Sequence, residues 1–429
     1  MLKKQTIKNL FHRELLSWSL ISFALSALEG GVAGVLVNLF FKDQVSDFWL
    51  SQAVALAAGA PAIANLSSPI WAQLEQGRDK VKLVAFLSTL SAFSVLLYAL
   101  APANSVGLLM AVLGSLLGRI CWSGVLTVRS ALWRANYPRY LRAKITAKLA
   151  LPMSLILAFA GSLIGWLSAG SIENVRILYI VLISLGLLGA NFYRGLKIKG
   201  AEKLALSEKN LSATEGGFSW KMLYSILKKD KPYRHYIYTM FIFGSGNLMF
   251  MAPLILIIND QLGIPQWQQV LITSSLPLAA LPFTIHLWAK KLNHMHIIQY
   301  RAVHSWSFVA AIALFNVASI FDAAWLLWPA SFTFGTAVAG AVLGWNLGHH
   351  DYTTPERASR YMAVHVTLTG VRGLIMPILG VNIYQWLKLY SSEWAKYTLL
   401  LPLLLSMMGA LIFMRLAKHQ KLPVLPKTA

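Results

Sequence analysis

Residues that most catalytic and metal-binding sites need are scarce or absent in this sequence. Its single cysteine, Cys121, lies inside an apolar stretch, which excludes a disulfide framework and a thiolate metal site. The chain has no phosphate-binding loop of the Walker type, no HExxH zinc motif and no nucleophile elbow. The adjacent pair His349 and His350, followed by Asp351, is poorly arranged to hold one metal ion. We therefore expect a protein that is not an enzyme and that holds no cofactor and no metal.

Charged residues are also few: 13% of the 429 residues are charged, whereas 57% are hydrophobic. The hydrophobic residues come in long runs rather than in the alternating pattern of strands. This predicts an all-α polytopic membrane protein surrounded by the lipid bilayer. A net charge of +22 would suit nucleic acid, but the cations lie in loops between the apolar runs. That distribution is typical of membrane insertion, so we expect no nucleic-acid partner.

The apolar runs predict twelve transmembrane helices. They cover residues 15–41, 48–71, 82–101, 106–134, 145–169, 175–195, 235–258, 267–289, 298–321, 324–348, 361–387 and 396–416. When the loops are assigned alternately to the two sides, the side of the N-terminus holds 32 of the 38 Lys and Arg residues in loops and helix ends. The opposite side holds Lys42, Arg176, Lys388 and Lys396, and the remaining two, Arg119 and Arg372, fall deep within spans. The positive-inside bias therefore predicts a multi-pass protein of the cell membrane, in bacteria the inner membrane, with both termini cytoplasmic.

The two halves of the chain share a repeat. Trp71-Ala72 closes the second span and Trp288-Ala289 the eighth, while Pro138 and Pro355 follow the fourth and tenth spans; each pair is separated by 217 residues. The shared shift indicates two six-helix pseudo-repeats, one over residues 1–195 and one over 235–429. A polar cytoplasmic linker, residues 196–234, joins them and is expected to hold a short amphipathic helix around residues 220–227.

The first span contains a carboxylate, Glu29, in the middle of its apolar stretch. Ser19, Ser22, Ser26 and Glu29 recur at spacings of three, four and three, which places them on one face of a continuous helix. A carboxylate at membrane depth is costly unless it faces a polar cavity, finds a partner or takes a proton. Glu29 therefore either faces an aqueous pathway or is held by a cation; the alternative is that it only holds two helices together.

Span eleven carries a polar stripe at spacings of four, four and three, formed by Tyr361, His365, Thr369 and Arg372. Arg372 has no acid nearby in the sequence, which suggests anion binding or gating. The alternative is an arginine that donates to the carbonyls of a broken helix. In span ten, glycines recur every four residues at Gly340, Gly344 and Gly348, a pattern that favours close helix packing.

Six spans, a long central connection and six more spans resemble the layout of the major facilitator superfamily of secondary transporters. The segment WAQLEQGRDKVKL between spans two and three is similar to the loop motif of that family, with Glu75 in place of the usual aspartate before Gly77-Arg78. The resemblance implies alternating access, a cavity lined by spans one, four, seven and ten, and a loop that steadies the outward-facing state. Glu75, Arg78 and Arg129 are therefore the expected gating residues, with Glu75 close to Arg78, Arg129 or Arg134.

The resemblance also indicates which side chains to expect in the central site. Arg119, at the middle of span four, is level with Glu29 if both helices cross fully, so Arg119 is the partner either of Glu29 or of the substrate. The rest of the expected substrate-binding set is Ser26, Tyr236, Phe243, Asn247, Thr369 and Arg372. In an acid–arginine pair, a substrate that competes for one partner changes how readily the other takes a proton. Arginine does not release its proton, so Glu29 is the expected proton-coupling residue.

These features predict a secondary active, proton-coupled transporter that moves a small organic solute by alternating access and works as a monomer. One acid against two arginines at mid-membrane favours an anionic solute. Two alternatives stay open. One is a proton-antiport efflux pump for drugs, metabolites or siderophores, and the other is a membrane sensor or scaffold that transports nothing.

Overall fold

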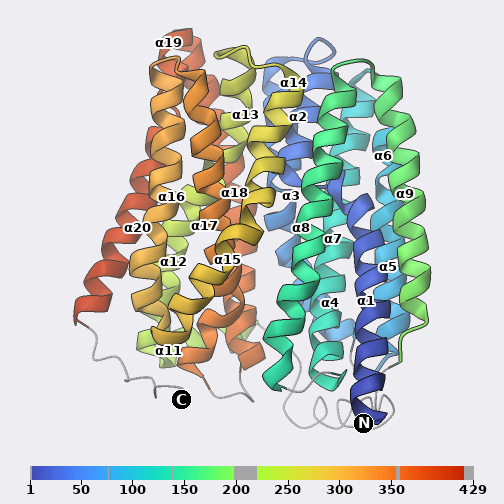
Figure 1. Cartoon of the computed structure of the whole chain (residues 1–429). Helices are drawn as coiled ribbons and strands as arrows, with labels where there is room; N and C mark the ends of the chain where they lie inside the picture. Colours follow the sequence, from blue (N-terminus) through green and yellow to red (C-terminus); the bar gives the residue numbers. More distant parts are fainter. Residues whose placement is uncertain (1, 76, 137–138, 198–219, 354–357, 420–429) are drawn as a thin grey trace.

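The computed structural model describes residues 2–75, 77–136, 139–197, 220–353 and 358–419 (Figure 1). Every regular element within these residues is a helix. Twelve helical stretches are long and apolar enough to cross a membrane. The predicted fold class, an all-α polytopic membrane protein with twelve transmembrane helices, is confirmed.

The first six spans come from nine α-helices. They are α1 (Leu2–Ser26) with α2 (Gly30–Phe41), α3 (Asp47–Ile63) continued by the 3₁₀ turn Ala64–Ser67 and α4 (Ser68–Leu74), α5 (Lys80–Ser94) with α6 (Leu96–Ala99), then α7 (Ser105–Asn136), α8 (Arg139–Ser168) and α9 (Ile172–Arg194).

The second six spans follow a short helix, α11 (Trp220–Lys229), which lies where the amphipathic linker helix is predicted. They are α12 (Lys231–Met249) with α13 (Met251–Asp260), α14 (Gln266–Val270) joined by the π-helical turn Leu271–Ser275 to α15 (Leu276–His294), α16 (Ile297–Ile320), the 3₁₀ turn Ala324–Leu326 with α17 (Leu327–Leu347), α18 (Ala358–Tyr390), and α19 (Ser392–Ala395) with α20 (Leu400–His419). Of the predicted linker, residues 198–219 lie outside the described part of the chain.

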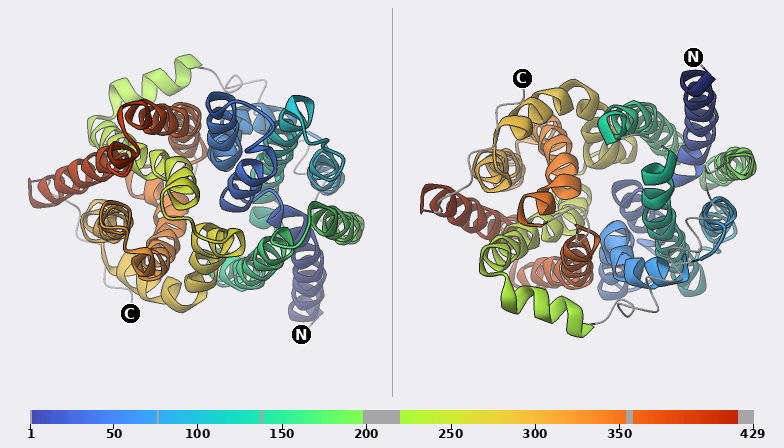
Figure 2. Two further views of the ribbon diagram at one scale, coloured as in Figure 1. Left: turned by 90° about the horizontal axis from the view of Figure 1, so that it is seen from above. Right: turned by 90° about the horizontal axis from the view of Figure 1, so that it is seen from below.

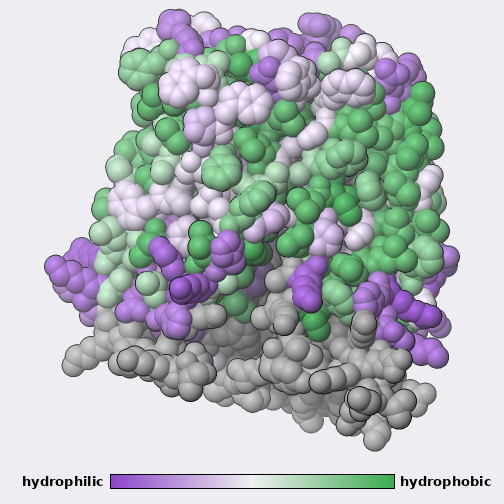
Figure 3. All heavy atoms as spheres, in the orientation of Figure 1, coloured by the Kyte–Doolittle hydropathy of each residue, from purple (hydrophilic) through white to green (hydrophobic). Residues whose placement is uncertain are grey.

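The first six spans lie on one side of the molecule and the second six on the other, in views from the side and from both ends (Figures 1 and 2). Helix α1 begins and α20 ends at the same end of the bundle, which we call the terminal side; the opposite end is the far side. On the face shown in Figure 3, the surface between these ends is mostly apolar, whereas polar residues gather toward the ends. An apolar belt between polar ends is the surface that a bilayer requires.

The predicted repeat has a counterpart in the structure. The Trp71 indole nitrogen donates to the carbonyl of Ile120 in α7, at 3.0 Å, and the Trp288 indole nitrogen donates to the carbonyl of Thr336 in α17, at 2.8 Å. In each half, therefore, the tryptophan that closes the second span is tied to the backbone of the fourth. The two halves use the same contact, which supports the internal duplication.

Spans one and seven are both interrupted near their middle. Span one breaks between α1 and α2, where Glu29 has an extended backbone (φ −64°, ψ 133°), and span seven changes helix at Phe250. The prediction of one continuous helix over residues 15–41 is therefore wrong at Glu29. Discontinuous helices at corresponding places in two repeats are typical of transporters, in which such breaks flank the binding site.

The two halves pack closely across the middle of the molecule. Helix α2 lies so near the π-helical turn that a Cβ on Gly31 would come within 2.7 Å of the Thr273 carbonyl oxygen. A Cβ on Gly370 of α18 would likewise lie 2.7 Å from the backbone nitrogen of Leu66. Only glycine permits these approaches of one backbone to another.

Candidate functional site

The site that the sequence placed around Glu29 is built on the break in span one. The Ser26 hydroxyl, in the last turn of α1, donates to the Phe23 carbonyl at 2.6 Å, a local bond that competes with helix continuation. Glycines Gly30 and Gly31 follow at once and open α2. Glu29 is the N-cap residue of α2, and a carboxylate at this position is stabilised by the dipole of the helix.

Arg119 from α7 holds this break together. Its Nη2 lies 2.7 Å from Oε2 of Glu29, and its Nε donates to the Leu28 carbonyl at 2.7 Å. A helix break inside a membrane leaves backbone groups without partners, and each such group is costly there. One guanidinium therefore satisfies both the freed carbonyl and the carboxylate, in the planar two-bond geometry that arginine provides.

The two members of this pair differ in exposure. The Glu29 side chain is 27% exposed, whereas that of Arg119 is 8% exposed. On the far side of Glu29, residues 30–38 of α2 and 252–258 of α13 are all buried. The carboxylate is therefore partly exposed, whereas these residues beyond it toward the far side are buried.

The second half brings a further pair of polar groups to this region. Ser274 and Ser275 lie in the π-helical turn that packs on α2, and both hydroxyl oxygens are buried without a hydrogen-bond partner among the described residues. A Cβ on Gly31 would lie 3.0 Å from Cβ of Ser274. π-Helical turns in membrane helices often mark functional places. No sequence motif singled out these serines, because an extra residue in a helical turn leaves no pattern in hydropathy.

The sequence pattern that describes the Major Facilitator Superfamily matches residues 16–377. The chain belongs to the Major Facilitator Superfamily. A comparison with curated proteins gives no significant sequence match.

Solved structures of other superfamily members share the fold. The nucleoside transporter NupG superposes with a TM-score of 0.65 at 16% identity, over 95% of this chain and 100% of that one. A D-xylose-proton symporter gives 0.66 at 11% identity, over 96% and 97% of the two chains. An auto-inhibited peptide transporter of the POT family gives 0.66 at 13% identity, over 98% and 99%. At these identities the likeness establishes the fold alone.

Within this superfamily fold, the serine stripe of span one does not line polar space. Ser22 and Ser26 are both fully buried, and each donates to a carbonyl of its own helix, Ser22 to Trp18 at 2.8 Å. The prediction that Ser26 faces a polar cavity is therefore wrong in this conformation. The reason is the break at Glu29, which ends the helical register that would have placed serines and carboxylate on one face.

The predicted substrate residues of span seven also lie inside the second half. Tyr236 is 2% exposed and stacks on Tyr352, with ring centroids 5.2 Å apart. Phe243 is 1% exposed and packs edge-on against Phe308 and Phe413. Asn247 accepts a hydrogen bond from Ser406 of α20 at 3.1 Å. This face of span seven holds the bundle together, a correction to its predicted place in the central cavity.

Arg372 donates to backbone carbonyls of α12, which is continuous at that point, so these are not the carbonyls of a broken helix. Its Nη1 donates to the carbonyl oxygens of Met240 and Phe241 in α12, and its Nη2 donates to the Thr369 hydroxyl at 2.9 Å. The Thr369 hydroxyl itself donates to the His365 carbonyl at 2.9 Å. Thr369 and Arg372 are thus brought together, but within the described residues no hydrogen bond or ion pair joins them to Glu29 or Arg119.

The predicted gating residues Glu75 and Arg78 lie together in the loop between spans two and three, whereas Arg129 pairs with a residue of α1. Lys80 Nζ lies 4.0 Å from Glu75 Oε2 and donates to the Glu75 carbonyl, and the Arg78 backbone nitrogen also donates to that carbonyl. Arg129 forms an ion pair with Glu14 of α1, Nε to Oε1 at 2.9 Å, with both side chains 4% exposed. The expected approach of Glu75 to Arg134 lies outside the described side chains. Sequence reasoning missed Glu14 because it counted the N-terminal segment as a loop.

A polar network on the far side was also missed. The rare basic residues of that side were noted, but not that Asp260 joins Lys42 at 3.3 Å and Lys388 at 3.0 Å, while Lys388 also reaches Asp47 at 3.4 Å. A hydrogen bond of 2.7 Å links Gln52 to Asn382 beside them. The Lys42–Asp260, Asp47–Lys388 and Gln52–Asn382 bonds cross between the halves. A hollow of about 270 Å³ is lined by Lys42, Asp47, Asp260 and Lys388, among other residues.

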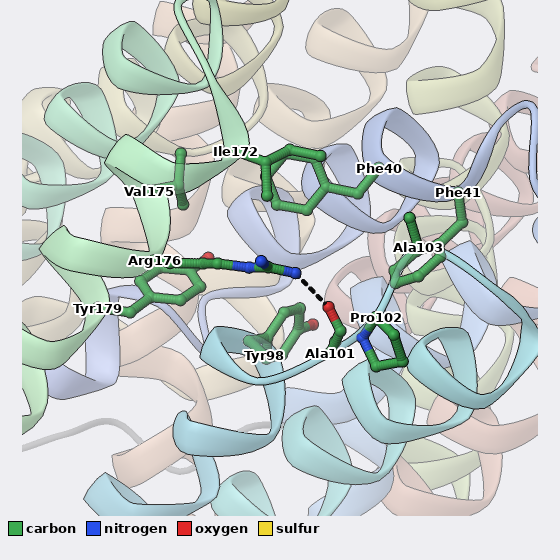
Figure 4. Close-up of a pocket in the computed structure, with 10 residues that line it drawn as sticks. All are labelled: Phe40, Phe41, Tyr98, Ala101, Pro102, Ala103, Ile172, Val175, Arg176 and Tyr179. Atoms are coloured by element: carbon green, nitrogen blue, oxygen red, sulfur yellow. Dashed lines mark hydrogen bonds between the residues drawn. The ribbon is translucent and has the colours of Figure 1, made fainter.

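A second hollow lies on the far side of the first half. Its wall is largely apolar, and Arg176 closes one end by donating to the Ala101 carbonyl at 2.6 Å (Figure 4). The volume is about 20 Å³, which is room for about one water molecule. This hollow is too small to be a solute site.

Proposed function

We propose that this chain is a secondary active transporter that moves a small organic solute by alternating access, with protons as the coupling ion. The observation that carries the proposal is the ion pair between Glu29 and Arg119 at the break in span one. An ionisable residue within the membrane is by default a functional residue. Here it also lies at a helix break, where transporters of this architecture bind their substrates.

In this scheme Arg119 alternates between Glu29 and the solute. When the solute donates a carboxylate or another acceptor to Arg119, the carboxylate of Glu29 loses its counter-charge and binds a proton. When the solute leaves, Arg119 returns and the proton is released. A pairing of this kind that changes proton binding by one pK unit is worth about 1.4 kcal/mol, or about tenfold coupling between proton and solute.

The charge of the site favours a solute with an anionic or strongly accepting group. Arg119 supplies two donors in a plane, which suits a carboxylate. The solved structures with this fold include a proton symporter for xylose and transporters for nucleosides and for peptides. Solutes of these classes, together with mono- and dicarboxylic acids, form the set to be tested.

Purified protein in proteoliposomes tests the proposal. We expect one class of this set to accumulate when an inward proton gradient is imposed, and to equilibrate without accumulation when the gradient is collapsed with an ionophore. Accumulation that is unaffected by the ionophore would exclude proton coupling. A purified protein that moves none of these classes, in either direction, would favour the sensor or scaffold alternative.

A further inference from the structure

The two halves of the molecule treat their buried arginines differently. In the first half, Arg119 is paired with Glu29 at 2.7 Å and Arg129 with Glu14 at 2.9 Å. In the second half, Arg301 is 1% exposed and Arg372 is 3% exposed. Neither forms an ion pair with any residue that the structure describes. The second half therefore holds two buried positive charges without a carboxylate against them.

Arg301 belongs to α16 and points at the glycine face of α17. A Cβ on Gly344 would lie 2.9 Å from its guanidinium carbon, and a Cβ on Gly340 would overlap the ring of His304. The glycines at four-residue spacing thus make room for polar side chains rather than for another helix backbone. His304 Nδ1 accepts from Arg301 Nη1 at 3.3 Å, and His304 Nε2 donates to the Ala337 carbonyl at 2.8 Å.

The unpaired charges act on each other. Arg301 and Arg372 are close enough to repel one another, and both act on the buried imidazole of His365. Two carboxylates act on the tyrosines at the rim of this region: Asp351 on Tyr236 and Tyr352, and Asp230 on Tyr352. Asp230 accepts from the Tyr361 hydroxyl and from the Tyr233 backbone N–H. Asp351 is already engaged, because its Oδ2 accepts the backbone N–H of Ile297 at 2.7 Å.

Four buried polar atoms in this region have no hydrogen-bond partner among the described residues: Nε of Arg301, Nε of Arg372, Nε2 of His365 and the hydroxyl of Tyr352. The arginine atoms can only donate. Burial raises the pKa of Tyr352, so its hydroxyl keeps its proton and can donate as well. A buried donor without an acceptor costs free energy, because it has lost its hydrogen bonds to water. A single ligand with several acceptor atoms would satisfy these donors.

We propose that this cluster, defined by Arg301, Arg372, His365 and Tyr352, is a binding site for a small oxyanion such as a phosphate or a carboxylate. An oxyanion supplies both the missing negative charge and several acceptors. The arginines and His365 are at most 4% exposed inside the bundle, so the ligand is a free anion rather than the headgroup of a lipid against the outer surface. Tyr352 lies in the 3₁₀ turn Gly348–Tyr352 after α17, which makes the terminal side the route of entry.

The site stands apart from the Glu29–Arg119 pair, and a binding measurement separates the two. The full chain in detergent is titrated with inorganic phosphate and, separately, with succinate, while potassium chloride keeps the ionic strength constant. We expect at least one of the two anions to raise the melting temperature and to bind saturably by calorimetry. Arg301→Gln should weaken this binding at least tenfold, whereas Arg176→Gln, at the small far-side hollow of the first half, should leave it unchanged.

Two results would overturn the proposal: no binding of either anion to the unmodified chain, or equal binding by the Arg301→Gln variant. If that variant does not fold, Tyr352→Phe removes one donor at the rim and leaves both arginines in place. It should weaken binding about threefold or more, and unchanged affinity in this variant would also contradict the site. Loss of binding in Arg119→Gln would reassign the anion to the central pair.

Discussion

At the scale of single residues, an arginine in this bundle is stabilised by whichever acceptors its backbone position brings within reach. Arg119 meets a carboxylate and a carbonyl, Arg129 a carboxylate, and Arg372 two carbonyls and a hydroxyl. A buried ion pair contributes little net stability, but removal of one partner leaves the other charge uncompensated. The three arginines should therefore differ in what their loss does.

Arg129 gives the sharpest stability prediction. Arg129→Gln leaves the carboxylate of Glu14 buried without its cation, which should cost about 3–5 kcal/mol of unfolding free energy. Lys82→Gln is the matched control, since the Lys82–Asp79 pair is 82% and 50% exposed and should be worth less than about 1 kcal/mol. Thermal unfolding in detergent measures both. Equal melting temperatures for the two variants would show that the buried pair is not structural.

The sequence predicted some partners of the buried arginines and gave no indication of others. It placed Glu29 and Arg119 at the same depth in the membrane but left their pairing open. The depth of a residue follows from the hydropathy of its span, whereas the direction in which its side chain points depends on the rotation of the helix about its axis. Nothing in the sequence indicated that Glu14 pairs with Arg129. Arg301 lies near the start of a span, so its position in the sequence groups it with the cations at helix ends, which are expected to be exposed. In the structure Arg301 is only 1% exposed. Burial of a cation near a helix end depends on the neighbouring helix, here on the glycines of α17.

At the scale of elements, the break in span one and the π-helical turn of span eight form one contact. Gly31 follows the break and touches the backbone of Thr273 in the turn. Both features depart from the regular helix that hydropathy predicts, and both lie where the halves meet. The spans themselves follow from the hydropathy of the sequence, but the breaks in them depend on local backbone conformation.

Gly31→Ala should loosen the closed contact on the far side. The added methyl would lie 2.7 Å from a carbonyl oxygen, so the halves must separate there. Asn38→Cys, at a position 2% exposed, reports the change in a background in which Cys121 is replaced by serine. We expect faster labelling of Cys at position 38 by a membrane-impermeant maleimide added from the far side. Gly170→Ala, where a Cβ meets only ordinary contacts at 3.5 Å, is the control and should leave the labelling rate unchanged.

At the scale of the whole molecule, the far side is tied shut by bonds between the halves. Lys42 of the first half joins Asp260 of the second, and Asp47 of the first half joins Lys388 of the second. Within the second half, Lys388 and Tyr384 also bond Asp260. The partners across the halves are more than 200 positions apart in the sequence, so no local pattern could have paired them. In the alternating access that we propose, this structure is the state with the far side closed.

Asp260→Asn should shift the molecule toward opening on the far side. The substitution removes the charge that holds two lysines but keeps the size of the side chain and some of its hydrogen bonds. With the same cysteine reporter at position 38, we expect labelling from the far side to accelerate several-fold. Asp43→Asn, at an exposed position of the same loop region, serves as the control. An unchanged rate for Asp260→Asn would show that the network does not hold the far side closed.

The charge distribution between the two sides gives a prediction about orientation. Reporters fused after Lys209 and after Ala429 should both report the cytoplasm, because the terminal side carries the great excess of Lys and Arg. A reporter found outside the cell at either place would contradict the orientation. The far-side network would then face the cytoplasm.

Proton-driven accumulation by the Glu29→Gln variant tests the central claim most directly. Glutamine keeps the size of the side chain and can still accept from Arg119, but it cannot take up and release a proton. In proteoliposomes with the solute that the unmodified chain accumulates, the account predicts that Glu29→Gln exchanges labelled solute across the membrane and does not accumulate it under an inward proton gradient. If Glu29→Gln accumulates solute as the unmodified chain does, Glu29 is a helix-packing residue and the coupling mechanism is wrong.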